Sequence, residues 1–183
     1  NSNLSSENLR NIKGIGWKDS DGNLIINNPE SIVPQERMDI DLPGYAWDLL
    51  PMKKYPLDLY RSHVWHANFN ESIRTPYAAI YTSLGCVFGC GFCMINILNR
   101  TDNSNDVHAG DSRVMRFWSV DWVIKQFKIL DDLGVKTVRI SDEMFLLNQN
   151  YYKPICEELS KFKNKFHIWA YSRIDTVRSS LLK

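Results

Sequence analysis

Short apolar strands alternate with amphipathic helices through the second half of this chain, and this alternation most constrains its fold. Three short runs of apolar, β-branched and aromatic residues have the length of strands: residues 77–81, 135–140 and 167–171. Two longer segments repeat apolar side chains at helical spacing: residues 119–133 and 150–163. Ser119 is typical of a helix N-cap, and Gly134 is typical of a helix stop. The sequence therefore predicts an α/β fold whose parallel strands are joined by right-handed crossovers.

The region before residue 77 has a different character. Residues 12–27 predict a β-hairpin, because two Ile-bearing runs flank the turn dipeptide Asp21-Gly22. Residues 28–76 hold all but one of the seven prolines of the chain, together with many aromatic residues. Few long regular elements form at that proline density, whereas the aromatic residues argue against disorder. We therefore expect an ordered but irregular connector with short helical turns.

Both ends of the chain have features of a cut. The sequence does not begin with Met, and the third predicted strand lies close to the last residue. A complete (β/α) barrel takes roughly 250 residues, far more than the alternating region offers. We therefore expect a fragment with a domain boundary after residue 76. We also expect such a fragment to be poorly soluble alone, because it leaves sheet edges uncovered.

Three of the four cysteines lie within the string TSLGCVFGCGFCM at residues 82–94, with the spacing Cys-x3-Cys-x2-Cys. The string follows directly after the first predicted strand of the alternating region. Ligand sites gather at the carboxyl ends of such strands. Thiolates are the usual protein ligands of iron–sulfur clusters. Three of them on one glycine-rich loop favour a [4Fe–4S] cluster that leaves one iron open to a small molecule.

Other interpretations of these cysteines remain open. A structural zinc site needs four ligands, commonly from two cysteine pairs, and only Cys156 and His108 are distant candidates to complete one. A third interpretation makes the cysteines small core residues without a metal. Disulfides are the least favoured, because such crowding gives poor geometry.

The cysteine string resembles the signature of the radical S-adenosylmethionine superfamily. TSLGCVFGCGFC is similar to the pattern of the subgroup whose members usually carry an N-terminal cobalamin-binding domain, although Leu84 and Val87 replace its usual Arg and Pro. The segments GIGWKDSDGNLIINNPE and DIDLPGYAWDLLPMKKY are similar to the hairpin and connector of that subgroup. The resemblance implies that residues 77–183 are the first part of a radical SAM (β/α) barrel, truncated after its third strand. Residues 1–76 would then follow a missing cobalamin-binding-like domain.

The resemblance also implies a reaction and its cofactors. Cys86, Cys90 and Cys93 would bind a [4Fe–4S] cluster that reductively cleaves S-adenosylmethionine to a 5′-deoxyadenosyl radical. Cobalamin-dependent methyl transfer and oxidative cyclisation are among the reactions implied, with cobalamin bound elsewhere in a longer parent. The implied partners are a small-molecule substrate and an electron donor such as flavodoxin or ferredoxin. A zinc-bound interaction module and a cluster-bearing protein without activity are the alternatives.

Five further residues are implied as contacts of S-adenosylmethionine. Phe92 holds the aromatic position just before the last cysteine of the string, which lies near the adenine in this superfamily. Asp142 and Glu143 end the second predicted strand, where polar groups bind the amino group of the methionine moiety. Ser172 and Arg173 end the third strand in a segment that resembles one with polar contacts to the same ligand.

The overall composition excludes few classes of partner. Lys and Arg total 22 against 21 for Asp and Glu, so overall charge gives no sign of nucleic-acid binding. The sequence has neither a signal peptide nor an apolar run of transmembrane length. Together with the cysteine cluster, these features predict a reduced, cytoplasmic location.

Overall fold

The computed structural model of the chain describes residues 5–50, 61–98 and 113–177. The chain forms two compact units. The first is drawn from residues 1–33 and 87–114, and the second from residues 34–86 and 115–183. The predicted domain boundary after residue 76 stays a prediction. None of the helices in the described ranges combines the length and the apolar character that a membrane crossing requires.

The first unit contains the predicted hairpin. Its described elements are α1 (Ser6–Arg10), β1 (Gly16–Lys18), β2 (Leu24–Ile26) and α3 (Ile95–Leu98). β1 and β2 pair antiparallel, with Trp17 opposite Ile25. The Asp19 carboxylate accepts hydrogen bonds from the backbone N–H groups of Asp21 (3.0 Å) and Asn23 (2.8 Å). Gly22 has a φ of +83°, which glycine adopts at no steric cost, so the hairpin prediction is confirmed.

The second unit is built on a three-stranded parallel sheet. Its strands are β3 (Tyr77–Ile80), β6 (Thr137–Ile140) and β7 (His167–Ala170), in the order β3-β6-β7. Ala78, Val138 and Ile168 are aligned across the three strands. The prediction of an α/β fold with parallel strands is confirmed. The described residues form an open sheet, and a barrel is not shown by them.

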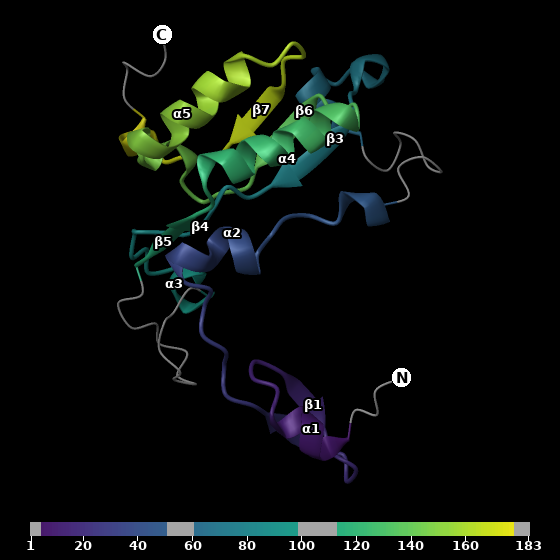
Figure 1. The fold of residues 1–183 in the computed structure, drawn as a ribbon, viewed down its shortest axis with the longest axis vertical. Helices are drawn as coiled ribbons and strands as arrows, with labels where there is room; N and C mark the ends of the chain where they lie inside the picture. The colour runs from purple at the N-terminus through teal and green to yellow at the C-terminus, as the bar shows by residue number, and fades with distance from the viewer. Residues whose placement is uncertain (1–4, 51–60, 99–112, 178–183) are drawn as a thin grey trace. The chain divides into compact units, whose positions relative to one another are not determined.

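Two helices, α4 (Val120–Asp132) and α5 (Gln149–Ser160), lie together over one face of this sheet (Figure 1). The side chains between the helices and the sheet are almost completely buried: Ala78, Ile80, Val123, Phe127, Leu130, Val138, Ile140 and Ile155. Burying one such large side chain contributes about 1.5–3 kcal/mol. The predicted helix signals are confirmed, because the Ser119 hydroxyl accepts from the Trp122 N–H at 3.1 Å and Gly134 has a φ of +77°.

The opposite face of the sheet is less covered. Strand alternation places Ala79, Arg139 and Trp169 side by side on it. The ring of Trp65, from the short 3₁₀ helix η3 (Val64–Ala67), meets Trp169 edge-on with centroids 4.5 Å apart. Trp169 is nevertheless 44% exposed. We call this surface, centred on the three aligned residues, the open face.

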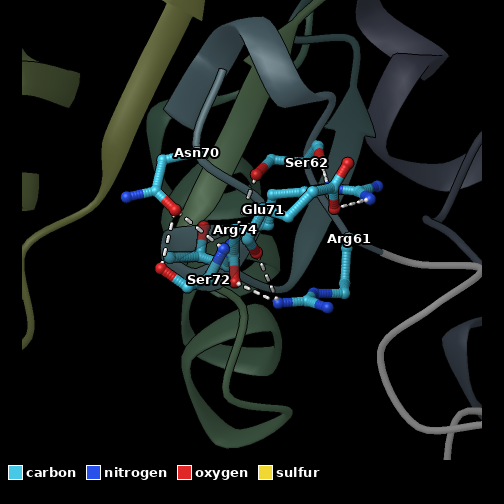
Figure 2. A network of polar contacts seen from close by, with 7 residues as sticks. Arg61, Ser62, Asn70, Glu71, Ser72 and Arg74 are labelled. Atoms are coloured by element: carbon cyan, nitrogen blue, oxygen red, sulfur yellow. Dashed lines mark hydrogen bonds and ion pairs between the residues drawn. The ribbon is translucent and has the colours of Figure 1, made fainter. Parts of the chain in front are cut away.

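The connector has the predicted irregular character wherever it is described. It contains the 3₁₀ helices η1 (Gln35–Arg37), η2 (Trp47–Leu49), η3 and η4 (Glu71–Ile73), and the short helix α2 (Met38–Asp41). Residues 51–60 lie outside the described residues. Figure 2 shows the polar network that orders the segment before β3. Arg74 donates to the Ser62 carbonyl (2.5 Å) and to the Glu71 carboxylate (2.7 Å), and Arg61 donates to the Glu71 carbonyl (3.2 Å).

Three details differ from the sequence expectations. An unpredicted antiparallel pair joins β4 (Ser83–Gly85) to β5 (Met115–Phe117). Helix α5 begins at Gln149, so Pro154 lies beyond its first turn, the part of a helix that tolerates proline. The sequence from Asp175 onward predicts a further helix, but the described residues there form the 3₁₀ turn η6 (Ile174–Thr176), and residues 178–183 lie outside the described residues.

Candidate functional site

The parallel sheet brings three polar segments to one edge. Thr82 follows β3, Asp142 and Glu143 follow β6, and Ser172 and Arg173 follow β7. The carboxyl ends of parallel strands meet at the same edge, which is where ligands bind in open α/β sheets. The structure therefore places four of the predicted contact residues on one edge of the second unit.

Asp142 is a buried carboxylate that holds the chain in place at this edge. Its side chain has no exposed surface. It accepts hydrogen bonds from the backbone N–H of Thr82 (2.6 Å), the hydroxyl of Thr82 (2.6 Å) and the hydroxyl of Ser83 (2.7 Å). Burial raises the pKa of this carboxyl, and the three donors oppose that rise. Because its oxygens are occupied by the chain itself, Asp142 positions the turn after β3.

Tyr151 supports the same turn from helix α5. Its hydroxyl donates to the Thr82 carbonyl at 2.6 Å. Burial raises the pKa of this phenol, so Tyr151 keeps its proton and its hydrogen bond at neutral pH. Thr82 is thus held through its backbone N–H, its carbonyl and its side chain, and the turn that leads into β4 is fixed.

Glu143 has a different environment from its neighbour. Its Oε2 atom is buried and has no hydrogen-bond partner among the described residues. Desolvation raises the pKa of this carboxyl, a hydrogen bond from the backbone N–H of Glu143 itself opposes that rise, and the charge of Asp142 adds to it. A buried acceptor without a partner loses about 1–3 kcal/mol relative to a satisfied one. Glu143 therefore has the capacity to accept a hydrogen bond from a ligand, most strongly from a cation.

An aromatic cavity of about 330 Å³ lies beside the turn that Asp142 holds. Its wall includes four aromatic side chains: Tyr45, Tyr81, Trp118 and Trp122. Both tryptophan N–H groups donate to connector carbonyls, that of Trp118 to Leu42 (2.9 Å) and that of Trp122 to Pro43 (3.0 Å). Their rings stack with centroids 4.7 Å apart, so the wall is rigid and its polar atoms are satisfied.

Tyr45 and Tyr81 join this cavity to the sheet edge. The Tyr45 hydroxyl accepts the Tyr81 backbone N–H at 2.6 Å. Burial raises the pKa of Tyr45, so its phenol also stays neutral. Tyr81 directly precedes Thr82, which binds Asp142. The cavity and the carboxyl edge of the sheet are therefore two parts of one candidate site.

The predicted residues after β7 are engaged within their own turn. The Ser172 hydroxyl pairs with that of Thr176 at 3.0 Å. Arg173 binds the two carboxylate oxygens of Asp175 at 3.0 and 2.7 Å. This bond holds the pKa of Asp175 below its usual range. The ligand-binding roles of Ser172 and Arg173 stay predictions.

The cysteine string is divided between the two units. Cys86 is buried in the second unit, whereas Cys90, Phe92 and Cys93 belong to the first. The Cys93 N–H donates to the Cys90 carbonyl at 3.0 Å, and Phe92 is 95% exposed. Within the described ranges, no three or more His, Cys, Asp and Glu side chains form a group that could hold a metal ion. His108 lies outside those ranges.

Sequence reasoning missed most of the aromatic cavity. The aromatic residues of the connector predicted order but no cavity, and Trp118 and Trp122 lie in the helix-and-strand pattern without marking a ligand site. The one available signal of this cavity was the segment Asp41-Leu42-Pro43, because its proline restricts the backbone next to aromatic residues. The Thr82 and Ser83 hydroxyls were read only as part of the cysteine string.

Comparison with known proteins gives one informative relative. The chain is 27% identical over 176 residues to a protein of Pyrococcus horikoshii described as an uncharacterized methyltransferase. The match covers 96% of this chain and 32% of the relative, so the chain spans about a third of the length of the curated relative it matches. No protein-family model and no solved structure matches the chain.

These findings correct the function predicted from the cysteine string. The similarity is to a methyltransferase, and the described residues bring together no metal-holding group from Cys86, Cys90 and Cys93. They overturn the prediction that a [4Fe–4S] cluster cleaves S-adenosylmethionine to a radical, and the zinc-module alternative with it. Neither the comparison nor the described residues support cobalamin.

Proposed function

We propose that this chain carries the S-adenosylmethionine-binding part of a methyltransferase. The similarity to a methyltransferase extends over 96% of the chain, which includes both the aromatic cavity and the carboxyl edge of the sheet. The relative is about three times as long as this chain, so the methyl acceptor and the complete reaction belong to the proposal as well.

The unpartnered Oε2 atom of Glu143 carries this proposal. S-adenosylmethionine has an ammonium group, a sulfonium and a flat adenine. A buried carboxylate oxygen without a partner fits the ammonium. The aromatic cavity beside the turn that Asp142 holds fits the adenine by stacking, and aromatic faces attract a sulfonium as they attract other cations.

The residues around the site have distinct roles in this proposal. Glu143 binds the ammonium, while Asp142 and Tyr151 hold the turn that separates Glu143 from the cavity. Tyr45 and Tyr81 exclude water from one side. When bound, S-adenosylmethionine supplies an electrophilic methyl group to a nucleophile. The contacts of Phe92, Asp142, Ser172 and Arg173 with this ligand remain predictions.

Isothermal titration of the full chain with S-adenosylmethionine tests the proposal. We expect saturable binding by the wild-type chain and about 10- to 100-fold weaker binding by Glu143→Gln, because a hydrogen bond to a charged group contributes about 1.5–3 kcal/mol. Glu30→Gln is the matched control, since it makes the same change at an exposed carboxylate that already has a partner, Lys13. A wild-type chain that does not bind the ligand contradicts the proposal.

A further inference from the structure

Arg139 places a positive charge on the open face of the sheet. It lies in the middle of β6, aligned between Ala79 of β3 and Trp169 of β7. Its Nε atom is buried and has no hydrogen-bond partner among the described residues. A guanidinium presents five donors and no acceptor.

The guanidinium of Arg139 is directed toward the carboxyl edge. The register pairs Ile140 with Ala170, so Tyr171 lies one residue beyond the end of β7. The Arg139 guanidinium carbon is 5.3 Å from the centre of the Tyr171 ring. The side chain therefore extends from mid-strand toward the edge that carries Glu143. Stacking on a ring occupies the face of a guanidinium and leaves its N–H edge available.

Tyr171 also anchors the turn that contains Glu143. Its carbonyl accepts the Phe145 N–H at 3.1 Å, two residues after Glu143. One residue thus supports the Arg139 guanidinium with its ring and the Glu143 turn with its backbone. Arg139 and Glu143 have opposite charges, and each has a buried polar atom without a hydrogen-bond partner in the described part of the chain.

We propose that Arg139 binds the carboxylate of the methionine moiety of S-adenosylmethionine. This inference rests on the proposed function. An α-amino acid presents an ammonium and a carboxylate on neighbouring atoms, and Glu143 and Arg139 offer the two complementary charges from one strand and the turn that follows it. A planar guanidinium matches a carboxylate with two parallel hydrogen bonds. Arg173, the residue that the sequence favoured for this role, already binds Asp175 in that manner.

The test compares two ligands that differ only in this carboxylate. S-adenosylmethionine and its decarboxylated analogue are titrated into the full wild-type chain, Arg139→Gln and Arg139→Lys. We expect Arg139→Gln to weaken binding of S-adenosylmethionine about 10- to 100-fold and to leave binding of the analogue within about threefold. Arg139→Lys keeps the charge but loses the planar fork, so its affinity for S-adenosylmethionine should lie between the other two.

Two control variants accompany the titration. Lys136→Gln removes one positive charge at the opposite end of β6, where Lys136 is exposed, and should change neither affinity. Arg173→Gln tests the competing arginine. Thermal unfolding of each variant, followed by circular dichroism, verifies that the sheet is folded before the affinities are compared.

The outcomes separate the two proposals. Selective loss of S-adenosylmethionine affinity in Arg139→Gln supports the inference. If Arg139→Gln weakens binding of both ligands equally, the inference about Arg139 is wrong and the proposed function stands. The same holds if the selective loss occurs in Arg173→Gln and not in Arg139→Gln. A wild-type chain that binds neither ligand overturns the proposed function and this inference together.

Discussion

Two neighbouring acidic residues serve different ends because their surroundings differ. Asp142 is fully buried and binds three donors of the chain, whereas Glu143 has a buried oxygen with no partner among the described residues. A satisfied buried carboxylate stabilises the turn that it holds, and an unsatisfied one destabilises the fold until a ligand arrives. The three hydrogen bonds of Asp142 therefore hold the turn after β3, whereas the Oε2 atom of Glu143 can still accept a hydrogen bond.

Replacing Asp142 by Asn should destabilise the chain by about 1–3 kcal/mol. An amide has one oxygen where the carboxylate has two, so at least one of the three donors from Thr82 and Ser83 loses its acceptor. Urea unfolding followed by circular dichroism measures the free energy of unfolding. Asp175→Asn is the control, because its side chain is exposed, and we expect little change there. Equal stability of Asp142→Asn and the wild-type chain would show that Asp142 does not form these hydrogen bonds to Thr82 and Ser83.

Replacing Glu143 by Gln should stabilise the ligand-free chain at neutral pH. Burial raises the folded pKa of Glu143 above its ordinary value of 4.5, so the folded chain holds this proton more tightly than the unfolded chain does. The group therefore favours folding below pH 4.5, and this contribution is lost as pH rises through the folded pKa.

The advantage of Glu143→Gln should consequently appear between pH 4.5 and neutrality. It should stay below about 1 kcal/mol, because the side chain is only half-buried and solvent screens its charge. The measurement is the difference in free energy of unfolding between variant and wild type from acid to neutral pH. A difference that is constant with pH, or that falls as pH rises, contradicts the assignment of Glu143 as an unsatisfied carboxylate.

The sequence could locate these residues but not assign their roles. Asp142 and Glu143 were predicted as a pair because both follow a strand. Which of them turns inward depends on Thr82 and Ser83, which lie far from them in the sequence. Arg139 received no attention, because an isolated arginine within a strand pattern carries no signal. Its significance comes from Tyr171, a residue of a neighbouring strand end.

At the scale of elements, local signals were reliable and long-range pairings were not. The Asp21-Gly22 turn and the Ser119 cap each act within a few residues, and both predicted elements formed. β4 and β5 are only three residues long and pair across a long stretch of sequence, Leu84 with Arg116. A segment of three residues is too short to show the alternation of apolar and polar side chains that indicates a strand.

The cavity wall depends on a close approach between the connector and helix α4. Gly44 has a φ of +142°, and a Cβ atom placed there would lie 2.8 Å from the amide nitrogen of Gln126. Gln126 is almost completely buried and accepts a hydrogen bond from the Trp47 indole at 3.3 Å, so it has little freedom to move. Only glycine fits at this position.

Gly44→Ala should therefore destabilise the chain by about 1–3 kcal/mol and weaken binding of S-adenosylmethionine, since the neighbouring Tyr45 lines the cavity. Gly91→Ala is the matched control. Apart from its chain neighbours, no atom of the described residues lies within 4 Å of its added methyl group, and we expect a change within about 0.5 kcal/mol. Thermal unfolding and titration with the ligand give the two readouts. If Gly44→Ala matches the control in stability and in affinity, the connector does not approach helix α4 closely at Gly44.

At the scale of the whole molecule, the layer of helices over a parallel sheet was predictable and the division into two units was not. The layering follows from the alternation of strand and helix patterns. The division joins residues 87–114 to the N-terminal segment, and composition gives no sign of that partnership. Its consequence for function is that the cysteine string crosses from one unit to the other, which its compact spacing does not suggest.

The outer edge of the sheet, strand β7, is a surface on which copies of the chain could associate. β7 has a strand neighbour on one side only within the described residues, and each of its four residues is exposed. Ile168 is 40% exposed. An uncovered, apolar edge strand pairs readily with another chain, and a lysine on such an edge opposes that pairing.

We therefore expect the full chain to self-associate reversibly, and Ile168→Lys to weaken this association. Sedimentation velocity over a range of concentrations measures it as a rise in average mass. Ile40→Lys is the matched control, because it makes the same change at a residue that is 65% exposed on helix α2 and not on a strand edge. Circular dichroism verifies that both variants are folded. A wild-type chain that stays monomeric at every concentration contradicts the prediction, since it requires the β7 edge to be already protected. If both variants weaken association equally, added charge and not edge pairing controls it.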